Sequence, residues 1–99
     1  MLESTAVLTT ASGPKYLVQL CKHFAHKIEV SYSESHGECR FGRGSAVLDA
    51  DETGLRMVAR AGDEEGLAQV QSIVESHLVC FAFREDMAAL DWRRQDRAA

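Results

Sequence analysis

The sequence has few cysteines, no long apolar run and no excess of positive charge. Cys21, Cys39 and Cys80 form an odd set without a Cys-x-x-Cys pair, which argues against a disulfide framework and for a reducing compartment. We therefore expect them to be small core residues. No apolar run approaches the ~20 residues that span a bilayer, and the first residues lack a basic region followed by an apolar one. These absences predict a cytoplasmic protein that does not cross a membrane.

The charge balance argues against nucleic acid as the main partner. Eleven Lys and Arg residues against fifteen Asp and Glu residues give a formal net charge of −4, the wrong sign for a protein that binds a phosphate backbone. Arg93, Arg94 and Arg97 form a local basic stretch, but aspartates alternate with them. We interpret 93–99 as a polar tail.

The composition is typical of one folded domain, with 45% apolar and 26% charged residues in a chain of 99. No linker, repeat or low-complexity segment divides it, so 1–99 is predicted to be a single domain. A chain of this size has one core and no deep internal cavity. Any site should therefore lie in a surface groove or at an interface.

Two segments have helical periodicity and five have the alternation of strands. Pro14 opens the first predicted helix, which ends near His26 or Lys27. The second runs from Asp63 to about Phe83, although the β-prone stretch 79–83 leaves a short strand after His77 as an alternative. Strands are predicted over 4–10, 28–32, 38–41, 46–50 and 55–60.

This order of elements predicts an α+β fold. A two-layer sandwich satisfies it, with an antiparallel sheet, formed by a meander plus the N-terminal strand, and two helices on one face. The other sheet face and the sheet edges would be available for a homodimer.

Three stretches together resemble a bacterial family of unknown function, DUF2218. They are 16–27, which carries two histidines, 76–78 with a third, and 81–85 with the pair Arg84 and Glu85, followed by Trp92. The resemblance covers nearly the whole chain and implies a stand-alone protein of this length. The resemblance implies an association with siderophore and iron-uptake proteins, and so with metal, but it implies no mechanism.

Four residues are a candidate metal site. Cys21, His23 and His26 lie on the first predicted helix and His77 on the second. Residues three apart on a helix are neighbours, so His23 and His26 can reach one ion if His77 joins them. Three histidines with an open position are typical of a catalytic or transport site, here for zinc or iron, rather than of a closed structural site.

Structural roles are the alternative for each histidine. On the helical wheel His23 lies beside the buried arc, where it would bond a backbone carbonyl, and His26 lies near the opposite side, where it would complement the helix dipole. His77 lies on the apolar arc and would bond a backbone carbonyl or the hydroxyl of Tyr16 or Tyr32.

Arg84 and Glu85 are a second candidate polar site, either a carboxylate-binding fork or an ion-pair network on a solvated surface.

Three hypotheses of function follow. The first is a dimeric, non-enzymatic binding domain near iron or siderophore handling, which presents His23, His26 and His77 at the junction of the helices. The second is a small enzyme in which these histidines perform acid–base or metal-assisted chemistry. The third is a protein-interaction module with structural histidines. No cofactor other than a metal ion is predicted.

Overall fold

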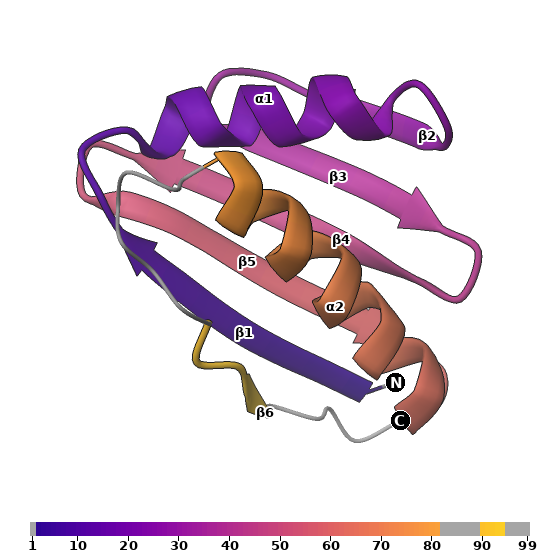
Figure 1. The fold of residues 1–99 in the computed structure, drawn as a ribbon. Helices are drawn as coiled ribbons and strands as arrows, with labels where there is room; N and C mark the ends of the chain where they lie inside the picture. The colour runs from indigo at the N-terminus through magenta and orange to yellow at the C-terminus, as the bar shows by residue number, and fades with distance from the viewer. Residues whose placement is uncertain (1, 82–89, 95–99) are drawn as a thin grey trace.

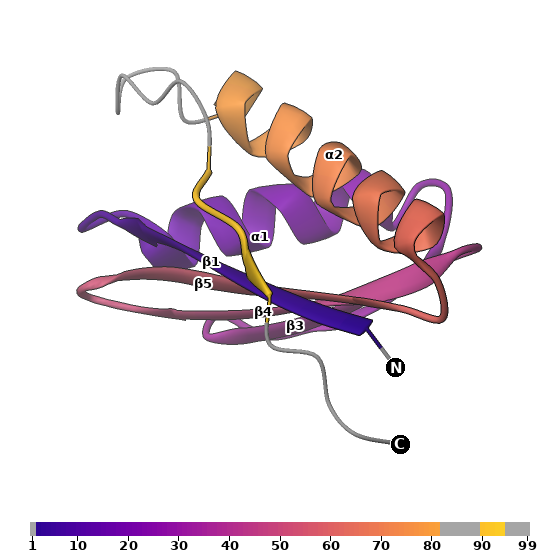
Figure 2. The ribbon, with the colours of Figure 1, turned by 90° about the horizontal axis from the view of Figure 1, so that it is seen from below.

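Alternating apolar residues form the strands of one antiparallel sheet, which two helices cover on one face (Figures 1 and 2). The structure is a computed structural model that describes residues 2–81 and 90–94. The sheet has the strand order β2-β3-β4-β5-β1-β6. The predicted α+β sandwich is therefore confirmed, with β2 to β5 as the meander. The elements are β1 (Leu2–Thr9), α1 (Gly13–Phe24), β2 (Glu29–Tyr32), β3 (His36–Phe41), β4 (Gly44–Asp51), β5 (Gly54–Ala61), α2 (Glu64–Phe81) and β6 (Arg93–Arg94).

The register of the strands gathers the small and branched side chains beneath the helices. Met57 of β5 pairs with Ala6 of β1 on one side and with Leu48 of β4 on the other. All three are buried, and Leu17 and Val74 of the two helices complete the core above them. The opposite sheet face carries the alternating, mostly polar residues.

The first helix begins against the sheet and ends earlier than predicted. At its start, a Cβ atom on Gly13 would collide with the carbonyl oxygen of Gly54, so the helix can lie this close to the β4–β5 turn only with glycine. Its last helical residue is Phe24, followed by a turn in which the Ile28 N–H donates to the Phe24 carbonyl at 3.0 Å. The predicted end at His26 or Lys27 is wrong because the chain must turn there to reach the edge strand β2.

The second helix has the predicted start and includes Val79–Phe81. The Asp63 carboxylate accepts a hydrogen bond from the Gly66 N–H at 2.7 Å, which caps the first turn. Residues 79–81 are helical, so the alternative of a strand from residue 79 is wrong for these three residues. Within the described part of the chain, no helix is long and apolar enough to cross a membrane.

Glu75 holds the last described segment against α2. Its Oε1 accepts hydrogen bonds from the Leu90 N–H at 2.9 Å and from Trp92 Nε1 at 3.2 Å. Arg93 and Arg94 then pair with β1 as the short edge strand β6. The polar tail predicted for 93–99 thus begins with two residues in the sheet, and 95–99 lie outside the described residues.

The cysteines divide into two classes. Cys21 and Cys39 are buried and Cys80 is exposed, all as free thiols. The expectation of a core role is confirmed for the first two. It is wrong for Cys80, because this position lies on the solvent side of α2.

Candidate functional site

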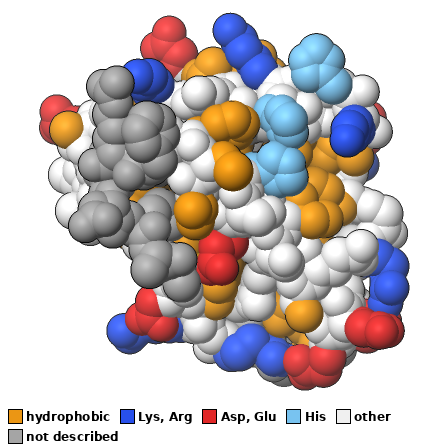
Figure 3. All heavy atoms as spheres, viewed as in Figure 1, with side chains coloured by type: hydrophobic (Ala, Val, Ile, Leu, Met, Phe, Trp, Pro, Cys, Tyr) orange, Lys and Arg blue, Asp and Glu red, His pale blue; other side chains and the backbone are white. Residues whose placement is uncertain are grey.

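A hollow lies where the end of α1, the middle of α2 and the end of β3 meet. Its volume is about 270 Å³. Its walls come from α1 and the turn after it, from α2 and from β3: His23, Phe24, Lys27, Ile28, Phe41, Ile73 and His77. Histidine side chains gather among hydrophobic ones on this helix-bearing face (Figure 3). We call this site the histidine hollow.

Aromatic rings form a connected cluster along the hollow. The centroids of the His23 and His77 rings are 4.7 Å apart, with an angle of 46° between their planes. Phe24 meets His77 edge-on at 5.1 Å and Phe41 at 5.2 Å. His23 also meets Phe81 at 5.7 Å. These separations lie in the favourable range for ring pairs, so the two imidazoles are held by packing as part of an aromatic wall.

The backbone of α2 sets the tautomer of His77. The distance from His77 Nδ1 to the carbonyl oxygen of Ile73 is 2.7 Å. A carbonyl can only accept, so Nδ1 carries the hydrogen and donates it, and Nε2 is the acceptor of the neutral ring. The expectation that a backbone carbonyl holds this half-buried histidine is met, with Ile73 as the partner.

The structure brings together two of the four predicted metal ligands. His23 and His77 lie side by side, whereas His26 lies exposed in the turn after α1. Cys21 faces β3, where its sulfur lies 2.7 Å from the place of a Cβ atom on Gly37. Among the described residues, no group of three or more His, Cys, Asp or Glu side chains could hold a metal ion.

The thiol of Cys21 interacts with that of Cys39 on β3. This sulfur–sulfur hydrogen bond, together with burial, raises the pKa of Cys39 far above its ordinary value. The same hydrogen bond lowers the pKa of the Cys21 thiol, so Cys39 is the member of the pair that stays protonated in the core. The other predicted polar site, Arg84 and Glu85, lies outside the described residues.

Sequence reasoning missed most of the apolar wall of the hollow. Lys27 lies in the turn after α1, where helical spacing gives no guide, whereas Ile73 could have been found, because it lies four residues from His77 on the same face of α2. Phe41 could not, since only the pairing of β3 with β2 carries it beneath the end of α1. Phe24 is both buried and part of the wall.

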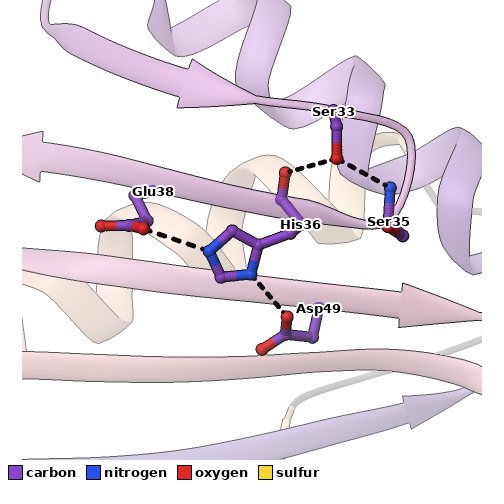
Figure 4. A network of polar contacts seen from close by, with 5 residues as sticks. All are labelled: Ser33, Ser35, His36, Glu38 and Asp49. Atoms are coloured by element: carbon purple, nitrogen blue, oxygen red, sulfur yellow. Dashed lines mark hydrogen bonds and ion pairs between the residues drawn. The ribbon is translucent and has the colours of Figure 1, made fainter.

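The fourth histidine, His36, lies on the sheet face opposite the helices (Figure 4) and is not among the residues that line the hollow. His36 Nδ1 is 2.6 Å from an Asp49 carboxylate oxygen, and Nε2 is 3.1 Å from one of Glu38. The bonds to Asp49 and then to Glu38 raise the pKa of His36. Both ring nitrogens already face carboxylates of the protein, so His36 is a structural clamp between β3 and β4.

Comparisons with known proteins identify a family and a fold. A family model described as an uncharacterised protein conserved in bacteria matches residues 5–93. The NMR structure of PA4090 from Pseudomonas aeruginosa is 33% identical to this chain, covers 96% of each chain and superposes with a TM-score of 0.77. No curated protein matches.

Proposed function

Because this chain belongs to the DUF2218 family of uncharacterised bacterial proteins, we propose its function from the geometry of the site. The protein is a non-enzymatic binding domain that holds a small aromatic acid in the histidine hollow. The observation that carries this proposal is the convergence of two packed imidazoles, apolar walls and one lysine on the same hollow.

The walls favour a flat, apolar ligand body. Phe24, Phe41, Ile28 and Ile73 supply apolar surface, and the rings of His23 and His77 supply faces and edges against which an aromatic ring can stack. Ligand sites typically combine such apolar walls with a few polar groups that fix orientation.

The charge of the hollow favours an anionic group on that ligand. Among the described residues that line the hollow, Lys27 is the one lysine or arginine, and none carries a carboxylate. No ion pair joins Lys27 to any residue that the structure describes. In a chain with a net charge of −4, this local cationic site selects for an acid by electrostatic complementarity.

Binding without catalysis is the role that the wall supports. A histidine acting as a general base is usually oriented by a neighbouring carboxylate and works on a nearby nucleophile. The wall residues that the structure describes carry neither a carboxylate nor a hydroxyl. His77 is instead oriented by a helical carbonyl.

Titration of ¹⁵N-labelled protein with three ligands tests the proposal. We expect benzoate to shift the amide signals of His23, Lys27 and His77, and both cyclohexanecarboxylate and benzyl alcohol to bind more weakly. Lys27→Gln should weaken benzoate binding about two- to fivefold, the range of one surface ion pair. Lys15→Gln, an exposed lysine at the other end of α1, is the matched control. Equal binding of the three ligands, or shifts that avoid the hollow, would refute the proposal.

We propose as a second role that the two imidazoles complete the coordination of a zinc or iron ion that a chelating ligand brings with it. The Nδ1–H of His77 donates to the Ile73 carbonyl, the arrangement that orients a metal-binding histidine and directs Nε2 to the ion. His23 lies beside it, so the protein would supply two ligands and the chelator the others. An ion bound in this way would suit the siderophore association that the family resemblance implies.

Calorimetry with Zn(II) and Fe(II), with and without salicylate, tests this second role. Binding that requires salicylate and is lost in His77→Ala, with the fold retained, supports it. His36→Ala is the matched control, because His36 lies on the opposite face. Metal binding that is the same with both variants, or absent with salicylate present, contradicts it.

We further propose that the protein acts in the cytoplasm and forms a homodimer through the open sheet face. Val7 is 60% exposed there, and Val58 and Val47 pair with each other in the adjoining strands. Sedimentation equilibrium of the protein and of Val7→Lys tests the dimer. If both proteins are monomers, the proposed homodimer is contradicted.

A further inference from the structure

A second hollow adjoins the histidine hollow along α2. The second has a volume of about 260 Å³ and is lined by Ile28, Phe41, Gly42, Arg43, Gln69, Val70 and Ile73. We call it the arginine hollow. Ile28, Phe41 and Ile73 line both hollows, so the two are compartments of one groove with a shared apolar middle.

The length of the groove follows from the helix that forms one wall. Gln69 and His77 lie eight residues apart on α2, about 12 Å along the helix axis at ~1.5 Å per residue. A single benzoate fills the histidine end only. A ligand that occupies the whole groove must be elongated.

The two ends of the groove differ in charge. Arg43 Nη2 lies 3.4 Å from Asp63 and 3.5 Å from Glu65, so two carboxylates already neutralise this guanidinium. Lys27 has no such partner among the described residues. An anionic group is therefore stabilised at Lys27 and repelled at the arginine hollow, where Gln69 can hydrogen-bond an uncharged polar group.

Resting on the proposed function, we infer that the ligand is an elongated aromatic acid with an uncharged polar tail. The aromatic ring that bears its carboxylate occupies the histidine hollow. An aliphatic linker crosses Ile28, Phe41 and Ile73, and an amide or a similar group at its end reaches Gln69. The shared apolar middle provides the linker with a continuous surface, and burial of its methylenes adds affinity.

Four benzoates test this inference. They are benzoate itself, 4-pentylbenzoate, and the analogues whose tail of the same length ends in a carboxamide or in a carboxylate. We expect the pentyl tail to tighten binding at least about tenfold through methylene burial. We expect the carboxamide to tighten it a further two- to tenfold, the typical net gain from a hydrogen bond, and the terminal carboxylate to bind more weakly than the carboxamide. Ligands with the tail should shift the amide signals of Gly42 and Gln69, and benzoate alone should not shift them.

Gln69→Ala separates the tail contact from general hydrophobic binding. The affinity ratio of the carboxamide to the pentyl ligand should fall to about one in this variant and be retained in Gln19→Ala, an exposed glutamine on α1. An unchanged ratio in Gln69→Ala, or a tail that leaves Gly42 and Gln69 unshifted while benzoate binds, overturns the inference alone. Failure of benzoate to bind in the histidine hollow overturns the proposed function, and the inference falls with it.

Discussion

Replacement of Gly37 by alanine tests how α1 is seated on the sheet. Gly37 lies on β3 beneath α1, and a Cβ atom there would lie 2.7 Å from the sulfur of Cys21 and 3.5 Å from Leu17 Cδ2. Both neighbours are fully buried, so neither side chain can swing into solvent. The new methyl group must push the helix away from the strand or force the Cys21 side chain off its rotamer, whereas Leu17 would lie at an ordinary van der Waals distance.

The expected cost follows from this contact. Overpacking by one methyl group in a close-packed core costs ~1–3 kcal/mol, and the reduced freedom of the unfolded chain returns only ~0.4–1 kcal/mol. Cys21→Ala alone removes one buried heavy atom and should cost ~1 kcal/mol. In the double variant the methyl group of residue 37 occupies the space that the sulfur leaves. Its free energy of unfolding should therefore lie close to that of the unchanged protein.

Urea unfolding of the four proteins measures this coupling. We expect the two substitutions to be non-additive by at least ~1 kcal/mol in the favourable direction. Gly62→Ala is the control, because a Cβ atom there meets nothing within 4 Å. If the effects of Gly37→Ala and Cys21→Ala add to within ~0.5 kcal/mol, the helix is not held against β3 by this contact.

Two other contacts give predictions of a different kind. Glu75→Ala should lower the free energy of unfolding by ~1–3 kcal/mol. It should also shift the fluorescence of Trp92, the single tryptophan, toward that of an exposed indole. Glu75→Gln keeps the acceptor oxygen and should shift the Trp92 fluorescence less. The raised pKa of His36 means that its bonds to Asp49 and Glu38 stabilise the fold fully below its ordinary value of 6.5 and are lost as the pH rises through the raised value. The free energy of unfolding, measured with urea, should fall over that pH range by less than ~1 kcal/mol, because these groups are half exposed. His36→Gln should remove the fall.

The layers of the fold could be predicted because local pattern and global packing agree. The alternation in β4 and β5 places Leu48 and Met57 on one face, and the pairing of the strands keeps them there. The end of α1 was less predictable, since the apolar spacing continues through Ile28. The helix stops at Phe24 because the next residues must enter the edge strand, a requirement of the tertiary fold that helical periodicity does not contain.

The site was only partly predictable for the same reason. The spacing of three residues between His23 and His26 assumed a helix through residue 26. Once the helix ends at Phe24, His26 moves into an exposed turn, and Cys21 faces the sheet. The pairing of His23 with His77 depends instead on how α1 and α2 cross over the sheet. That crossing is set by side-chain packing between distant segments.

Function is best sought where polar residues break the apolar pattern without serving the fold. Glu75 and His36 each have partners that explain their positions. His77 uses only one ring nitrogen for the fold, and Lys27 has no ion-pair partner among the described residues. His23 adds a ring that packs against the rings of Phe24, His77 and Phe81. Because these three side chains line the same apolar hollow, a bound acid is the partner that would satisfy all of them at once.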